Sequence, residues 1–245
     1  MTKIPVKLSE DLILDAMVVL RFTTSVPAEV VFGSVYQAIT RKFPESRLEH
    51  LPVLQIPEAF RRGNSILINQ PYWRFDVACH SIWVGPKVIS FSIRKPYIGW
   101  VEWRNFIMDL LPDLNVPFQD IEQISLRYVN FTERNLCDIA NINISVGSSN
   151  LSCQPMTFQI ESINDDVAIT LRLANKATIL TQLDQSRTGS VIDVEVSKRI
   201  QFCENFFNQP LGSALDDLHK IEKKSFFEIL QADFLASLEP TYEGN

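Results

Sequence analysis

The chain has 245 residues, which is enough for one large domain or two small ones. Hydrophobic residues make up 46% of it and charged residues 21%, so the composition is that of an ordinary globular protein and excludes a disordered chain. The net charge of -6 argues against broad binding to a nucleic acid backbone, and no stretch approaches the roughly 18 to 20 apolar residues of a membrane span, so we expect neither partner.

The first part of the chain is expected to fold as a strand, a helix and then several strands. Residues 12–22 are mostly aliphatic, and apolar residues at helical spacing predict a helix over residues 27–42. Short β-rich runs bounded by Pro, Gly or Asn predict antiparallel strands at residues 53–56, 65–68, 73–77 and 87–93. A second helix is expected to begin after Pro96 and to end near Pro112.

The second part begins with a predicted strand at residues 124–131, a weak helical stretch at 135–143 and a loop at 146–150. A four-stranded meander is expected next, with strands at residues 156–163, 167–173, 178–185 and 191–196 and with turns at 164–166, 174–176 and 187–190. Helices are expected at residues 197–208 and, after a break at 210–212, over a longer segment.

These elements indicate an α+β fold with antiparallel sheets and helices packed on one face. Residues 1–118 and 119–245 share the order strand, helix, about four strands and helix, and Leu20-Arg21-Phe22 is echoed by Leu126-Arg127-Tyr128. Two interpretations stay open: a duplicated β-α-β4-α unit with an extra C-terminal helix, or one continuous domain. The duplicated order resembles the saddle-like fold of TATA-binding proteins, an analogy of element order that carries no function.

The four cysteines, Cys79, Cys137, Cys153 and Cys203, are widely scattered. They form no Cys-x-x-Cys pair and have no histidine at zinc-finger spacing, so we expect no metal site. The N-terminus lacks the pattern of a secretory signal, which favours a cytoplasmic protein. Because that compartment is reducing, we expect the cysteines to be free thiols.

Arginines in predicted strands are candidates for binding an anion or a carboxylate. Arg21, Arg127 and Arg172 each follow a leucine, and a guanidinium group binds such ligands bidentately. Asn130 lies in the same strand as Arg127 and is a polar residue that a purely structural strand would least need. The competing interpretation is that these arginines form ion pairs with carboxylates on the sheet.

Tyr97 and Trp100 are candidates for lining a pocket for an apolar or aromatic ligand. Trp100 lies on the apolar stripe of its predicted helix, so packing in the core is the competing interpretation. Asp184, Asp193 and Glu195 lie on neighbouring predicted strands, where an acid–base pair or a cation site competes with a solvent-facing strand. The sequence has no Walker loop, nucleophile elbow or dinucleotide fingerprint, and we expect no cofactor.

Four segments form a recognisable combination: Leu20-Arg21-Phe22, Tyr97-Ile98-Gly99-Trp100, Leu126-Arg127-Tyr128-Val129-Asn130 and Val191-Ile192-Asp193-Val194. Together they resemble a sporadically distributed family of uncharacterised bacterial proteins of about this length. The resemblance covers nearly the whole chain, and its most specific parts are the Tyr-x-Gly-Trp motif and the Leu-Arg-Tyr-x-Asn strand. It implies a patchily inherited bacterial protein, which suggests mobile or defence-associated genes, and it assigns no activity or catalytic residue.

The missing catalytic signatures, the acidic charge and the aromatic content favour a non-enzymatic binding or protein-interaction module of the bacterial cytoplasm. Its expected partner is another protein, such as a toxin or defence effector, or further copies of the same chain. Enzymatic activity stays open, since the alternative is a small hydrolase or nucleotide-processing enzyme that uses carboxylates and arginines of the sheet. That alternative predicts that Asp193 or Glu195 converges with Arg127 or Arg172 in one concave pocket.

Overall fold

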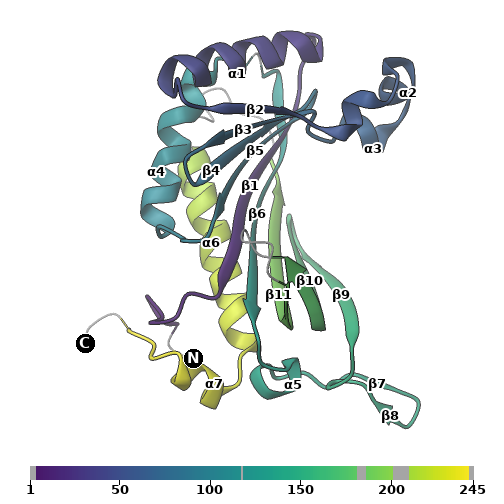
Figure 1. Ribbon diagram of the computed structural model, residues 1–245, viewed down its shortest axis with the longest axis vertical. Helices are drawn as coiled ribbons and strands as arrows, with labels where there is room; N and C mark the ends of the chain where they lie inside the picture. The colour runs from purple at the N-terminus through teal and green to yellow at the C-terminus, as the bar shows by residue number, and fades with distance from the viewer. Residues whose placement is uncertain (1–3, 117, 181–185, 201–209, 243–245) are drawn as a thin grey trace. The chain divides into compact units, whose positions relative to one another are not determined.

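A computed structural model describes residues 4–116, 118–180, 186–200 and 210–242 (Figure 1). It has the expected α+β fold, with a large antiparallel sheet. By their contacts, the residues divide into two compact units. The α1 unit comprises Asp15–Leu126 and Ser197–Leu218, and the β9 unit comprises Met1–Leu14, Arg127–Val196 and His219–Asn245. Each unit therefore draws on both of the halves that the sequence suggests, and the duplication stays a prediction.

The sheet of the α1 unit has the strand order β2-β3-β4-β5-β1-β6. Its strands are β1 (Ile13–Thr23), β2 (Arg47–His50), β3 (Trp73–Val77), β4 (His80–Val84), β5 (Val88–Arg94) and the first part of β6 (Asp120–Thr132). In β3, the buried residues Trp73, Phe75 and Val77 alternate with the half-buried Arg74 and Asp76. The strand thus has one apolar and one polar face, as expected from its period of two.

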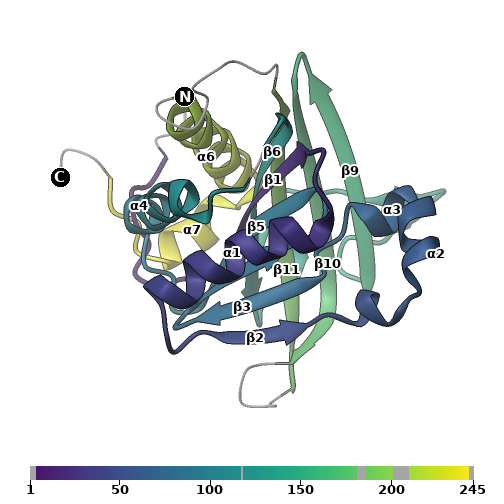
Figure 2. The ribbon, with the colours of Figure 1, turned by 90° about the horizontal axis from the view of Figure 1, so that it is seen from above.

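Helices cover the apolar face of this sheet (Figures 1 and 2). The helical elements of the unit are α1 (Ala28–Lys42), η1 (Pro52–Gln55), α2 (Glu58–Gly63), α3 (Ser65–Ile68), α4 (Trp100–Leu110) and η2 (Leu111–Leu114), where η marks a 3-10 helix. Phe32 of α1 stacks on Phe75, and Phe106 of α4 stacks on His80 with ring centroids 3.9 Å apart. His80 lies opposite Val77 in the register, and Val77 is two residues from Phe75, so Phe75 and His80 point to the same face. Helices α1 and α4 therefore both pack on that face.

Two of the predicted strands in this unit are helical. Residues 53–56 fall largely in η1, because Pro52 favours a first helical turn and cannot donate to a sheet ladder. Residues 65–68 form α3, because the Asn64 side chain accepts hydrogen bonds from the N–H groups of Ile66 and Leu67 and so caps the helix. Strands β2 and β4 were not predicted, whereas the structure confirms β1, β3, β5, α1 and α4.

The sheet of the β9 unit has the order β6-β11-β10-β9. Its remaining elements are α5 (Leu136–Ile139), β7 (Ser145–Val146), β8 (Ser149–Asn150), β9 (Met156–Asn164), β10 (Val167–Leu180), β11 (Ser186–Arg199), the end of α6 (Pro210–Ile229) and α7 (Ala232–Ser237). Strands β9 and β10 are antiparallel and are joined by the two-residue turn Asp165-Asp166. His219 of α6 lies against Tyr128 of β6, with ring centroids 6.1 Å apart, so the helix packs on the face that carries Tyr128. None of the described helices is long and apolar enough to cross a membrane.

Two of the turns predicted in the meander lie inside strands. Residues 174–176 belong to β10, because the buried Asn175 side chain accepts from the Leu136 N–H at 2.9 Å and donates to the Gln154 carbonyl at 3.0 Å. Residues 187–190 belong to β11, where a Cβ atom on Gly189 would lie 2.1 Å from the Thr132 carbonyl oxygen. This glycine therefore permits the close approach of two backbones and does not form a turn.

Three further predictions in this part of the sequence are corrected. The loop at 146–150 forms most of the β7–β8 hairpin, in which Gly147 supplies a φ of 59°. Residues 197–199 end β11 in place of starting a helix, and residues 201–208 lie outside the described part of the chain. The break expected at 210–212 is the start of α6, where the missing side chain of Gly212 leaves room for the guanidinium group of Arg104.

Cys137 and Cys153 form a disulfide bond, which corrects the expectation that all four cysteines are free thiols. Their Cα atoms are 5.3 Å apart although 16 residues separate them, because α5 and the β7–β8 hairpin fold the chain back on itself. Cys79 is free and half-buried, and Cys203 lies outside the described residues.

Candidate functional site

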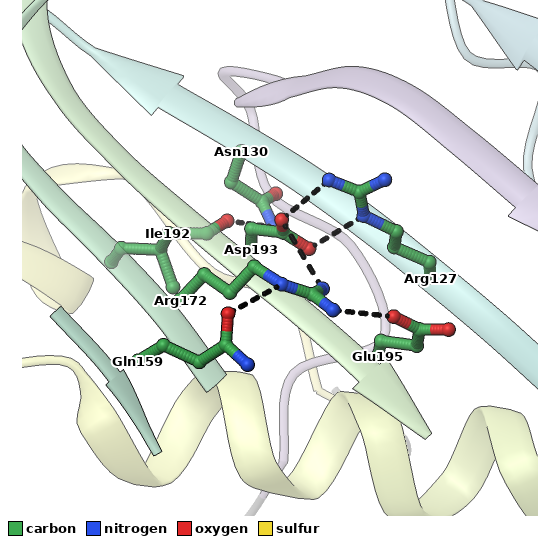
Figure 3. Close-up of polar contacts among 7 residues, drawn as sticks. All are labelled: Arg127, Asn130, Gln159, Arg172, Ile192, Asp193 and Glu195. Atoms are coloured by element: carbon green, nitrogen blue, oxygen red, sulfur yellow. Dashed lines mark hydrogen bonds and ion pairs between the residues drawn. The ribbon is translucent and has the colours of Figure 1, made fainter. Parts of the chain in front are cut away.

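Four charged side chains from three strands meet on one face of the β9 unit (Figure 3). Arg127 comes from β6 and Arg172 from β10, whereas Asp193 and Glu195 come from β11, where their spacing of two residues places them on the same side. Gln159 of β9 joins the set because it lies opposite Arg172 in the register. These five residues are called the charged row below.

Asp193 is the centre of the charged row. Its two carboxylate oxygens accept hydrogen bonds from Arg127, from Nε to Oδ1 at 2.8 Å and from Nη2 to Oδ2 at 2.6 Å. Nη1 of Arg172 lies 3.6 Å from the same Oδ2, and its Nη2 donates to Glu195 at 2.9 Å. Nε of Arg172 donates to Oε1 of Gln159 at 3.3 Å. Since the Asp193 side chain is only 6% exposed, these guanidinium groups replace the water that a buried carboxylate loses.

The formal charges of two arginines and two carboxylates cancel in the charged row. An incoming anion would have to displace a buried carboxylate from both guanidinium groups, at a large cost in desolvation. A general base also has to reach its substrate, whereas the Asp193 side chain is only 6% exposed and both of its oxygens accept from Arg127. The geometry therefore fits an ion-pair network that fastens β9 and β10 to the sheet.

The other residues singled out in the sequence lie in separate places. Asn130 is buried on the opposite side of β6 from Arg127, and its amide donates to the Ile192 carbonyl at 3.4 Å. Arg21 donates to the Asn69 carbonyl at 3.1 Å in the α1 unit. The structure therefore brings Arg127 and Arg172 together in the β9 unit, whereas Arg21 belongs to the α1 unit. Asp184, the third carboxylate considered, lies outside the described residues.

Tyr97 and Trp100 are packed near the start of α4. The Trp100 ring lies against Trp103 with centroids 5.9 Å apart, and Tyr97 contacts Trp103 edge-on at 6.2 Å. The indole N–H of Trp100 donates to Asp216 at 2.8 Å. Trp103, which both rings contact, is fully buried, so these two contacts fit the packing of α4 in the core of its unit.

A pocket of about 380 Å³ lies in the α1 unit, and none of these residues is among those that line it. It is bordered by the segment before α1, by α2 and by the turn at Pro86 and Lys87. Arg61 lies over the Tyr72 ring, and Arg62 forms an ion pair with Glu58, so two of its cations are already engaged. Among the described residues, no group of three or more His, Cys, Asp or Glu side chains is placed to hold a metal ion.

The outer edge of β9 is a feature that the sequence analysis missed. β9 is the last strand in the order of its sheet, and three of its apolar side chains are exposed: Phe158 (37%), Ile160 (50%) and Ile163 (69%). Phe158 lies opposite the buried Leu173, so the apolar face of the sheet continues outward to β9, beyond which no described strand pairs (Figure 1). The signal in the sequence was the low charge, since Glu161 is the one charged residue among the nine of β9.

Comparison with known proteins gives no guide to the β9 edge or the charged row, which are therefore interpreted from their own chemistry. No protein-family model matches the chain, and no curated protein sequence matches it.

Proposed function

We propose that the protein is a non-enzymatic interaction module that binds another protein chain along the edge of β9. The observation that carries the proposal is the length and low charge of this edge: nine residues, with Glu161 as the one charged side chain. An unpaired edge strand presents a row of backbone N–H and C=O groups that an extended segment can complete, which is a recurrent mode of peptide recognition.

Two features of the β9 unit support this mode of binding. Ile160 and Phe158 expose apolar surface beside the unpaired backbone, so a docked strand would bury side chains as well as complete hydrogen bonds. The charged row holds Arg172 against Gln159, Asp193 and Glu195, and so fixes β10 and β9 in place before a partner arrives. A preformed edge binds at a lower entropic cost than a mobile one.

The enzymatic alternative, a small hydrolase or nucleotide-processing enzyme, would use Asp193 or Glu195 with Arg127 or Arg172. These groups do meet, but they neutralise one another, and the pocket described above lies in the other unit. The interaction module therefore has the stronger support. The family resemblance favours the bacterial cytoplasm and a toxin or defence effector as partner, whereas a disulfide is more typical of an oxidising compartment, so cell fractionation should accompany the binding test.

The proposal is tested by crosslinking the full chain in its native cells and recovering the covalently attached partner in stoichiometric amount. Ile160→Lys should abolish the crosslinked product, because a lysine on the apolar side of β9 opposes strand pairing. Leu48→Lys is the matched control: Leu48 is 37% exposed on β2, the short edge strand of the α1 unit, and its replacement should leave the product unchanged. Equal recovery with wild type and Ile160→Lys would rule out β9 as the binding edge.

A further inference from the structure

The backbone groups that β9 directs outward can be assigned from its turn. A two-residue turn closes on a hydrogen-bonded pair, so Asn164 and Val167 direct their N–H and C=O groups at each other. Alternation along the strand then directs the backbone of even-numbered residues toward β10. The N–H and C=O groups of Thr157, Gln159, Glu161 and Ile163 therefore point away from the sheet, where no described strand accepts or donates.

The side chains along this edge are complementary to those of a second copy of β9 that runs antiparallel to it. Two copies can pair only if the residues whose backbone groups point outward lie opposite each other. The two-fold axis must therefore pass through a residue and cannot pass between two residues. An axis at Glu161 would place two carboxylates opposite each other, and an axis at Gln159 would leave Glu161 facing Thr157. An axis at Ile160 places Gln159 opposite Glu161 twice, which pairs an amide donor with a carboxylate.

The charged row orients Gln159 for that contact. Arg172 donates to Oε1 of Gln159 at 3.3 Å, so the amide oxygen faces the sheet and the amide NH₂ group stays available to donate elsewhere. Opposite it, in the register centred on Ile160, stands a carboxylate that can accept. The same contact forms a second time across the axis.

The other side of the strand is also complementary. In the same register, Ile160 lies opposite its own copy as a non-hydrogen-bonded pair, the arrangement in which side chains come closest. Phe158 and Ile160 share the face of the buried Leu173, which is continuous with the apolar side of the sheet. Pairing would thus extend both faces of the sheet across the axis, polar on one side and apolar on the other.

We infer that the partner of β9 is a second copy of the chain, paired antiparallel about Ile160 so that Gln159 of each copy donates to Glu161 of the other. This assignment rests on the proposed use of β9 as a binding edge. It names the occupant and the register of that edge, which makes it testable by charge reversal.

The test is sedimentation velocity of the full chain over a range of concentrations. Wild type should show a reversible monomer–dimer equilibrium, and Gln159→Glu should raise the dimer dissociation constant about tenfold or more, because it places a carboxylate opposite Glu161 at both of the symmetry-related contacts. Its own contact with Arg172 is retained, since a carboxylate accepts from Nε as the amide oxygen did. The double variant Gln159→Glu/Glu161→Lys should restore the dimer, because each new carboxylate then faces an ammonium group.

Each other outcome points to a different conclusion. A dimer that is insensitive to Gln159→Glu uses another surface, and the inferred register is then wrong. A chain that stays monomeric at every concentration, yet loses a crosslinked partner of different mass on Ile160→Lys, keeps the proposed function and overturns self-pairing. If the chain is monomeric and Ile160→Lys changes no partner, both are overturned.

Discussion

Edge strands β2 and β9 differ in how their exposed backbone is protected. β2 has four residues, two of them charged in opposite senses, and its Glu49 forms an ion pair with Arg74 of β3 at 2.7 Å. Arg74 in turn contacts Asp76 of the same strand at 3.0 Å, and Asp76 accepts a hydrogen bond from Ser81 of β4 at 2.6 Å, so polar contacts lead inward from this edge as they do from β9. A short, charged edge disfavours association, whereas the long and nearly neutral β9 permits it. The difference supports the proposal that β9, and not β2, is the binding edge.

The two units also differ in where their carboxyl groups lie. Asp76, the carboxylate that contacts Arg74, remains partly exposed on the polar face of the α1 unit. The β9 unit instead buries Asp193 in the charged row, and it buries Glu222 on α6 one turn before the buried Phe226. Burial in this helix raises the pKa of Glu222 to about 8. The pH dependence of stability that Glu222 contributes therefore arises in the unit with the exposed edge.

The largest expected effect is the pH dependence contributed by Glu222. Its pKa is about 8 in the folded chain and 4.5 in the reference state, so the folded chain binds the extra proton between these values and stability falls as the pH rises from about 4.5 to 8. Glu222→Gln removes this loss and should increase the free energy of unfolding by about 4 kcal/mol at pH 8. Urea denaturation at pH 8 and at pH 4 measures the difference in the free energy of unfolding between the variant and the wild type. At pH 4, which is below both pKa values, the two proteins should have the same free energy of unfolding.

The next effect comes from the disulfide of the β9 unit. The bond between Cys137 and Cys153 closes a loop of 16 residues and so lowers the conformational entropy of the unfolded chain. In the chain-entropy account this stabilises the folded state by about 3 kcal/mol. The double variant Cys137→Ser/Cys153→Ser should lower the free energy of unfolding by that amount in an oxidising buffer. Cys79→Ser is the control, since Cys79 is a free thiol of the α1 unit. If reductant leaves the free energy of unfolding of the wild type unchanged, the disulfide contributes nothing to the stability of the β9 unit.

Local patterns in the sequence were sufficient for the long elements and for the faces of the strands. Helical spacing predicted α1, and alternation placed Asp193 and Glu195 on one side of a strand. Short apolar runs were not sufficient: residues 65–68 suit a strand or a helix, and the Asn64 cap decides between them. The buried position of Glu222 could have been found, because it lies four residues before Phe226 at helical spacing.

Strand order is the part that local patterns could not supply. Arg127 and Asp193 are 66 residues apart, and they meet only because β6 and β11 are neighbours in the sheet. The exposed edge of β9 follows from the same order, since a strand with this sequence would be unremarkable in the middle of a sheet. The partners of the charged row and the location of the edge are thus long-range properties, which depend on how all the strands assemble.

The smallest expected effects compare the charged row with the polar contacts among Glu49, Arg74 and Asp76 in the α1 unit. Asp193→Asn leaves Arg127 and Arg172 facing each other without the carboxylate, and should lower the free energy of unfolding by about 2 kcal/mol. This is less than a fully buried pair would lose, because both arginine side chains reach solvent, at 39% and 33% exposure. Urea midpoints measured at pH 7 with the slope unchanged provide the comparison.

Glu49→Gln is the matched change in the α1 unit and should cost at most about 0.5 kcal/mol, because the Glu49 side chain is half exposed and its attraction to Arg74 is weakened by water. Raising the salt concentration should reduce this small loss further, whereas the loss for Asp193→Asn should persist, since ions screen a buried carboxylate poorly. Equal losses for the two variants would mean that the charged row is an ordinary surface network. The β9 edge would then have no more rigid a support than β2, and its binding would have to rest on its exposed apolar residues alone.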